Sequence, residues 1–172
     1  MNTKVKKGFT LIELLIVIAI IGVLAVAFLP TLLGAPAKAR DSQRISSIQT
    51  IQAFLVDRSL TVGSLPDGTC ILPDSGDDIS NIIAANLPSF GGTFPRDPRS
   101  ENGPPGCEGG FGYLKDPGVG YSAAVYAYLE TEENSNYDCS DVDAWGSEYT
   151  ELELGEYSPD NEGVPCFVAL VQ

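Results

Sequence analysis

The chain has 172 residues, of which 44% are hydrophobic, and its 23 acidic and 10 basic side chains give a formal net charge of −13. It contains no histidine, which excludes Ser-His-Asp and Cys-His nucleophiles, His-ligated zinc and an imidazole switch near neutral pH. A non-enzymatic protein is therefore expected, with enough apolar residues for one folded domain of ordinary size.

The charge is distributed unevenly along the chain. From Glu101 to Gln172 there are 15 acidic residues and a single base, Lys115, whereas residues 1–100 carry nine bases and eight acids. A surface of this sign repels phosphate, so nucleic-acid binding by the C-terminal part is not expected. We interpret that part as a solvated acidic surface.

An uninterrupted apolar segment lies near the N-terminus. Residues 14–29 include no polar side chain, and the apolar character continues to Gly34. At ~1.5 Å per residue, residues 14–34 form a helix of ~31 Å, which spans the hydrocarbon core of a bilayer. Lys4, Lys6 and Lys7 precede the segment, so the positive-inside rule predicts a cytoplasmic N-terminus and an exported remainder.

A cleaved secretory signal peptide, with a cleavage site at Ala37 or Ala39, is the ordinary alternative for such a segment. Two features disfavour it. The apolar stretch is longer than the 7 to 15 residues usual in signal peptides. It is also preceded directly by Glu13, whose carboxylate makes membrane insertion harder and therefore requires an explanation.

The segment carries a family resemblance. Residues 7–14 read KGFTLIEL and continue LIVIAIIGVLA, which resembles the N-terminal signature of type IV pilins and type II secretion pseudopilins. The resemblance covers residues 6–36. It implies that a membrane peptidase and methyltransferase cuts between Gly8 and Phe9 and methylates Phe9, so that Glu13 becomes the fifth mature residue. It also implies that Gly22 and Pro30 soften the helix.

The position of Glu13 agrees with this resemblance on physical grounds. Cleavage would create an amine at Phe9, and Glu13, four residues later, would lie on the same helical face. In a bundle of such helices the amine of one subunit could neutralise Glu13 of a neighbour, which gives assembly a register. The alternative is that Glu13 only snorkels to the lipid headgroups.

Residues 35–60 continue the helix as an amphipathic half. Its apolar positions step by three, three and four residues: Ile45, Ile48, Ile51 and Leu55. Its basic residues are interpreted as a solvated helix face: Lys38, Arg40, Arg44 and Arg58. A helix over residues 9–60 would be ~78 Å long, with bends or local melting expected at Pro30, Gly34 and Pro36.

Residues 61–172 are predicted to form an acidic globular head of single-domain size. A helix capped by Asp77 is expected over residues 78–87, followed by a loop rich in glycine and proline. A central strand is predicted at residues 121–129, with weaker strands at 111–114, 149–154 and 166–171. The expected fold class is α+β, with the long N-terminal helix packed on an antiparallel sheet of about four strands.

Four cysteines, Cys70, Cys107, Cys139 and Cys166, lie in the part predicted to be exported, where thiols oxidise. Four cysteines allow three connectivities, and proximity along the chain favours Cys70 with Cys107 and Cys139 with Cys166. The second pair also resembles the disulfide that closes the C-terminal loop of many pilins.

Two sharper readings of the acidic residues are kept as alternatives. Asp138, Asp141 and Asp143, or Asp160 with Glu162, could supply oxygen ligands to calcium, but without EF-hand spacing. No cofactor is therefore expected, with calcium as the open possibility. The tripeptide Asp74-Ser75-Gly76 occurs in dimeric aspartic proteases, but Pro73 before it favours an ordinary turn.

The sequence thus predicts a leader peptide (1–8), a transmembrane and assembly helix (9–34), an amphipathic half of the helical spine (35–60) and the head (61–172). We expect a structural subunit of a pilus-like extracellular filament, held in the cytoplasmic membrane before assembly and displayed on the cell surface afterwards. The resemblance implies these partners: copies of the chain, a prepilin peptidase, an inner-membrane assembly platform, minor pilins and membrane lipid.

A pseudopilin of a type II secretion system is the alternative within the family, and a membrane-anchored secreted enzyme or binding domain is the alternative outside it. The sequence leaves open whether the subunit is major or minor. It also leaves open any role in adhesion, motility or DNA uptake.

Overall fold

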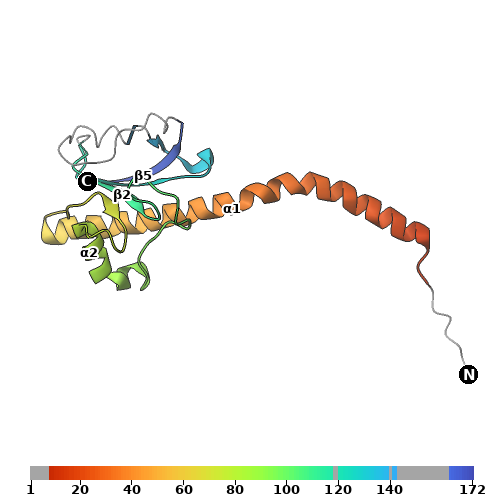
Figure 1. The fold of residues 1–172 in the computed structure, drawn as a ribbon, viewed down its shortest axis with the longest axis horizontal. Coiled ribbons are helices and arrows are strands. Elements are labelled where there is room, and N and C mark those ends of the chain that lie inside the picture. The colour runs from red at the N-terminus through yellow and green to blue at the C-terminus, as the bar shows by residue number, and fades with distance from the viewer. Residues whose placement is uncertain (1–7, 118–119, 140, 143–162) are drawn as a thin grey trace, which may run out of the picture. The chain divides into compact units, whose positions relative to one another are not determined.

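The computed structural model describes residues 8–117, 120–139, 141–142 and 163–172, and within residues 30–33 only the backbone is described. The chain divides into two compact units, Met1–Pro36 and Ala37–Gln172. Figure 1 shows the helices and strands, which are, in chain order, α1 (Leu11–Val62), β1 (Cys70–Ile71), α2 (Asp78–Ala85), η1 (Leu87–Phe90), β2 (Phe111–Lys115), β3 (Ala123–Tyr128), η2 (Glu132–Asn134), β4 (Tyr137–Asp138) and β5 (Pro165–Val171). The α+β class is confirmed.

The helix α1 has 52 residues and contains Pro30, Gly34 and Pro36 without a break. Of the two outcomes expected at these positions, bends or local melting, the helix does not melt, since a helix loses only one backbone hydrogen bond at each proline while the neighbouring turns keep theirs. The expected bends remain a prediction. The helix ends at Gly63, which adopts a left-handed conformation with φ 75° and donates its N–H to the Ser59 carbonyl at 3.1 Å. Glycine is favoured at such a helix end because it has no Cβ.

Five strands form one antiparallel sheet in the order β1-β2-β3-β5-β4. The strand β3 is central, as predicted, and pairs with β2 on one side and β5 on the other. Strands β1 and β4 have two residues each and were not predicted. The strand predicted at residues 149–154 lies outside the described residues.

The two faces of β3 are buried in different clusters. Ala123, Val125 and Ala127 face the main core, which α1 and α2 cover with five aliphatic side chains: Ile48, Ile51, Leu55, Ile79 and Ile83. Tyr126 and Tyr128 face the opposite side, together with Cys139 and Cys166. Val125 and the two tyrosines thus lie on opposite faces of β3, as alternate residues of a strand do. Burial of each of the side chains from α1, those of Ile48, Ile51 and Leu55, contributes about 2 kcal/mol to the free energy of folding.

Gly112 of β2 lies where a side chain of β3 leaves no room for a Cβ. Gly112 is paired with Tyr126 in the antiparallel register. A Cβ at residue 112 would overlap the aromatic ring of Tyr126, which lies over the glycine. The sheet therefore requires glycine at this position, because any side chain would displace the ring from its place in the core.

The helix α2 is present as predicted, but its cap differs. Asp77 occupies the N-cap position without a side-chain hydrogen bond to the helix. Its Oδ2 instead accepts the backbone N–H groups of Thr69 at 3.0 Å and Cys70 at 2.8 Å. Asp77 is thus the N-cap residue by position, as expected, but its carboxylate binds the amides beside β1 and makes no capping hydrogen bond.

Candidate functional site

The N-terminal segment begins with a reciprocal cap between Thr10 and Glu13. The Thr10 backbone N–H and hydroxyl donate to Glu13 Oε2 at 2.8 and 2.7 Å. The Glu13 N–H lies 3.4 Å from the Thr10 hydroxyl oxygen, which accepts it. This arrangement is a capping box, with Thr10 at the N-cap and Glu13 three residues later. The capping box fixes the start of α1. Its sequence pattern, Thr followed three residues later by Glu, is present in residues 10–13 (TLIE) and could have predicted this start.

Gly8 and Phe9, the predicted processing residues, lie immediately before this cap and outside any helix or strand. The side chain of Phe9 is 88% exposed. A Cβ placed on Gly8 would meet no atom within 4 Å. The peptide bond between Gly8 and Phe9 thus lies in exposed chain outside any helix or strand, of the kind that a peptidase can bind. Cleavage and methylation at this bond remain predictions.

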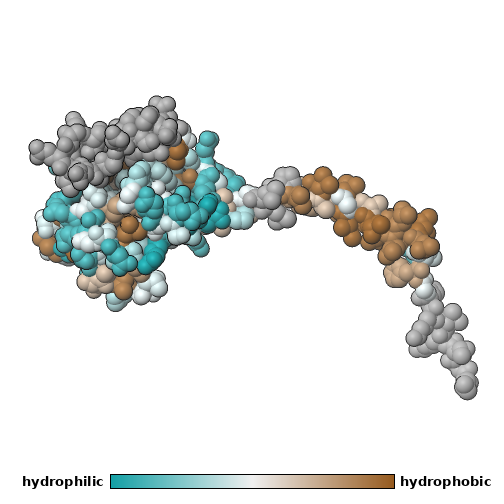
Figure 2. Space-filling view, viewed as in Figure 1, coloured by the Kyte–Doolittle hydropathy of each residue, from teal (hydrophilic) through white to brown (hydrophobic). Residues whose placement is uncertain are grey.

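All residues from Gly8 to Leu29 are exposed, including the large aliphatic side chains of α1. Figure 2 shows them as a continuous hydrophobic surface on the helix. In the described part of the chain, α1 is the one helix long and apolar enough to cross a membrane. An apolar surface of this size is stable only against lipid or against other protein chains.

Gly22 and Pro30 both lie inside α1. A Cβ at Gly22 would meet no atom within 4 Å, so no contact within the described chain requires glycine there. The predicted softening of the helix at these two positions remains a prediction.

Both disulfides have the connectivity that proximity along the chain favours. Cys70 is joined to Cys107, with Cα atoms 5.4 Å apart, and Cys139 is joined to Cys166, with Cα atoms 5.1 Å apart. The first links β1 to the loop before β2. The second fastens the segment after β4 to β5.

The calcium candidates are only partly placed. Asp138 accepts the Gly163 N–H at 3.0 Å, and Asp141 lies three residues farther along the chain. Asp143, Asp160 and Glu162 lie outside the described residues. Among the residues that the structure describes, no three acidic or cysteine side chains are grouped as metal ligands. Calcium binding thus remains an untested prediction.

The tripeptide Asp74-Ser75-Gly76 forms a turn. Ser75 donates its backbone N–H to the Leu72 carbonyl at 3.4 Å, and Gly76 has φ 80°. The Ser75 hydroxyl lies 2.9 Å from that of Ser80. These contacts are those of a tight loop that leads into α2.

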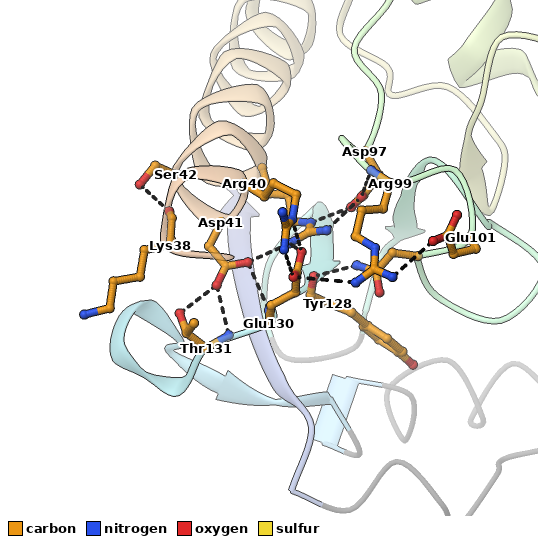
Figure 3. A network of polar contacts seen from close by, with 12 residues as sticks. Lys38, Arg40, Asp41, Ser42, Asp97, Arg99, Glu101, Tyr128, Glu130 and Thr131 are labelled. Carbon is orange, nitrogen blue, oxygen red and sulfur yellow. Dashed lines mark hydrogen bonds and ion pairs between the residues drawn. The ribbon is translucent and has the colours of Figure 1, made fainter. Parts of the chain in front are cut away.

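A cluster of six charged residues, which sequence reasoning missed, joins the outer half of α1 to two loops of the head. We call it the charged cluster: Arg40, Asp41, Arg44, Asp97, Arg99 and Glu130 (Figure 3). The Arg44 side chain is 0% exposed and donates to Asp41 at 2.7 Å and to Glu130 at 2.8 Å. It also binds both oxygens of Asp97, at 2.6 and 2.9 Å. The interpretation of Arg44 as part of a solvated helix face is therefore wrong.

Asp41 is the second buried member contributed by α1. Its carboxylate accepts the backbone N–H groups of Glu130 at 3.0 Å and Thr131 at 2.9 Å, and the Thr131 hydroxyl at 2.6 Å. Arg40 donates to Glu130 through two nitrogens, and Arg99 lies 3.7 Å from Glu130. With three arginines and three carboxylates, the charged cluster is neutral.

The hydrogen bond from Arg40 lowers the pKa of Glu130 to about 2, against the opposing effect of burial. For Arg44, burial acts to lower the pKa, but the hydrogen bonds to Asp97 and Glu130 outweigh it and raise the pKa above its usual value. Both residues therefore stay charged throughout the physiological range.

The spacing of residues along α1 could have predicted that Arg44 is buried. Arg44 precedes Ile48 by four residues, and Asp41 precedes Arg44 by three, so both lie on the face that Ile48, Ile51 and Leu55 define. The two charged residues continue the buried stripe. The sequence could not show which acids would meet Arg44, because Asp97 and Glu130 lie 53 and 86 residues away.

Comparison with known proteins gives matches that include the N-terminal segment. The family model described as the prokaryotic N-terminal methylation motif matches residues 3–29. The chain is 30% identical over 109 residues to a fimbrial protein of Dichelobacter nodosus, which covers 60% of this chain and 64% of the relative. It is 34% identical over 103 residues to the type IV major pilin protein PilE of Neisseria gonorrhoeae, which covers 60% of this chain and 55% of the relative.

A shorter match concerns the same segment. Over 36 residues, 21% of this chain and 28% of the relative, the chain is 64% identical to the type IV wide pilus major component PilA4 of Thermus thermophilus. The chain thus spans less than two thirds of the length of the curated relatives that it matches. No solved structure matches it at a significant level.

Proposed function

We propose that this chain, whose similarities support membership of the type IV pilin family, is a structural subunit of an extracellular pilus filament. The observation that carries the proposal is the exposed apolar surface of α1 over residues 11–29, with Glu13 near its start. Such a surface has two suitable environments, the lipid bilayer and a bundle of identical helices. A pilin uses both in succession.

The proposed sequence of events begins with insertion of α1 into the membrane, with the basic residues before Gly8 on the cytoplasmic side. A prepilin peptidase then cuts between Gly8 and Phe9 and methylates the new N-terminus. An assembly platform in the membrane transfers the mature subunit into the filament. The acidic head, held by two disulfides, is displayed on the cell surface.

Glu13 has a distinct role in each state under this proposal. In the uncut chain Thr10 supplies the hydrogen bonds to its carboxylate. After cleavage, the amine of Phe9 on a neighbouring subunit supplies a positive charge. A buried carboxylate paired with an amine is tolerated where either charge alone is not, so each subunit is accepted in one axial position.

The names of the relatives favour a pilus over a secretion pseudopilus, because two of them are described as major components of type IV pili. The two functions differ in a measurable product. A pilin yields long fibres on the cell surface, whereas loss of a pseudopilin abolishes the export of secreted enzymes.

The proposal is tested on fibres sheared from cells that express the chain. Mass spectrometry of the main component should find a mature chain that begins with methylated Phe9. The matched control is Gly8→Val, which should leave the chain uncut, in the membrane and absent from fibres. A mature chain that begins near Lys38 or Arg40 would instead identify an ordinary exported domain and overturn the proposal.

A further inference from the structure

The outer half of α1 packs on the head through a stripe with two parts. Residues Ile48, Ile51 and Leu55 form the apolar part, and Asp41 with Arg44 forms the charged part, all of them fully buried. Hydrophobic attraction is non-directional, so an apolar stripe selects its position only through the shapes and sizes of its side chains.

The apolar part discriminates against a shift of three residues along α1 at only one of its three positions. Such a shift in one direction brings Ile51 and Phe54 to the places of Ile48 and Ile51. In the other direction, Ile45 and Ile48 come to the places of Ile48 and Ile51. Two of the three core positions therefore remain apolar in either direction, and only the place of Leu55 receives a polar residue, Arg58 in the first case and Gln52 in the second.

The charged part discriminates strongly, because Asp41 and Arg44 are themselves three residues apart and of opposite sign. A shift in one direction places Arg44 where Asp41 was, against the donating N–H groups of Glu130 and Thr131. Asp97 then faces Ser47, loses Arg44 and keeps only the backbone N–H of Arg99. Two buried donors would meet without an acceptor.

The opposite shift is equally unfavourable. It places Asp41 where Arg44 was, against the carboxylates of Asp97 and Glu130. It also brings Lys38 to the place of Asp41, where the backbone requires an acceptor. Like charges would then be buried together without compensation.

We infer that Asp41 and Arg44 set the register between the head and α1, that is, the position along α1 at which the head packs. Buried ion pairs add little net stability over apolar side chains of the same volume, whereas a buried polar group is well suited to specify a register. In the filament proposed above, this register would fix the position of every head along its own helix. The register itself does not depend on filament formation.

The contact between Gln52 and Leu170 reports the register. The Gln52 side-chain amide donates to the Leu170 carbonyl of β5 at 2.7 Å. Solution NMR of the full chain in detergent micelles can detect this pair as a nuclear Overhauser effect. The wild type should give one set of signals with this effect. The control Asp67→Ala with Lys115→Ala, which removes an exposed ion pair, should give the same result.

The first test variant combines Asp41→Ala, Arg44→Met and Asp97→Leu, which leaves Glu130 paired with Arg40. It should fold and give a second set of signals, with at least a tenth of the intensity, that lacks the effect between Gln52 and Leu170. A single set of signals with this effect retained would show that apolar packing alone sets the register, and would overturn the inference.

The second variant moves the charged pair by three residues: Asp41→Ala, Arg44→Asp and Ser47→Arg. The register should follow the charges, so that Leu55 replaces Gln52 as the neighbour of Leu170. Retention of the Gln52 contact in this variant contradicts the inference. Failure of both variants to fold would mean that the charged cluster is needed for stability as such, which also overturns it.

Discussion

The guanidinium of Arg44 holds both carboxylate oxygens of Asp97, with Nε 2.6 Å from Oδ2 and Nη2 2.9 Å from Oδ1, although the two residues are 53 positions apart. Both side chains are fully buried. This bidentate pair fastens the loop before β2 to the outer half of α1.

Asp97→Asn keeps the shape of the side chain and removes its charge. Because Arg44 then stays buried without its main counter-charge, we expect the free energy of unfolding to fall by ~3–5 kcal/mol. Chemical denaturation of the full chain in micelles measures the change. The matched control is Glu101→Gln, since Glu101 also pairs with an arginine but is 71% exposed. It should change stability by less than ~1 kcal/mol. Equal effects of the two substitutions would contradict the assignment.

The contribution of Glu130 to stability should be measurable as a change in the free energy of unfolding with pH. The pKa of Glu130 is about 2 in the folded head, against the ordinary value of 4.5 that we take for the unfolded chain. The unfolded chain therefore binds a proton at higher pH than the folded chain, so the stabilisation is complete above pH ~4.5 and is lost as the pH falls toward 2. The difference corresponds to about 3 kcal/mol at most. Thermal unfolding between pH 2 and 6 measures it.

Glu130→Gln should remove this part of the pH dependence, and the difference between variant and wild type isolates it from the other acids. Glu132→Gln, an exposed neighbour, should leave the slope unchanged. A wild-type slope in Glu130→Gln would show that other carboxylates are responsible.

The two disulfides should contribute similarly to stability. Their loops differ little, with sequence separations of 37 and 27 residues, and the chain-entropy model gives ~4 and ~3.5 kcal/mol. The double substitutions Cys70→Ser with Cys107→Ser, and Cys139→Ser with Cys166→Ser, should each lower the free energy of unfolding by about these amounts. Peptide mapping without reduction should find the same two pairs in exported protein. A peptide that joins Cys139 to Cys70 would refute the connectivity.

Substitutions at Glu13 can separate its two roles. Glutamine can replace glutamate in a capping box, but it carries no charge for a neighbouring amine. We therefore expect Glu13→Gln and Glu13→Ala to reduce filament yield alike, since each leaves the amine unpaired at ~3–5 kcal/mol per contact. Processing and membrane insertion should remain intact in both. Blotting of cell fractions and counts of sheared fibres give the two readouts.

The control for these variants is Thr10→Val, which removes the capping hydroxyl and keeps the charge of Glu13. It should weaken the start of α1 by ~1 kcal/mol and leave filament yield near the wild-type value. If Glu13→Gln instead forms fibres normally and Thr10→Val does not, then Glu13 serves as a helix cap and has no role in charge pairing.

How far the sequence could predict the structure depended on how local each signal was. The apolar segment and the central strand were predicted because neighbouring residues determine them, and the disulfide pairs because each joins two cysteines that follow one another along the chain. The two-residue strands β1 and β4 have no pattern of their own, since they exist through pairing with β2 and β5. The carboxylate of Asp77 was expected to cap α2, because the sequence does not show that folding brings the backbone N–H groups of Thr69 and Cys70 next to it.

Arg44 shows a different limit of sequence reasoning. Its place on the buried stripe followed from the helical period, but the residue type argued for solvent exposure, because a charged side chain is rarely buried without partners. Its partners lie in two loops whose approach to α1 depends on the complete head. Residue type and periodicity disagreed at this position, and the periodicity was the better guide.

The charged cluster also determines the exposed charge of the head together with the outer half of α1. Residues 37–172 carry 22 acidic and seven basic side chains, and the cluster uses three of each. Outside it, 19 acids are therefore accompanied by only four bases. Heads brought side by side should repel each other over roughly one Debye length, which is about 8 Å at physiological ionic strength. In the filament proposed above, closely packed heads would depend on dissolved cations, and the ionic strength of the surroundings would act on their exposed charges while leaving the buried charge pairs almost unscreened.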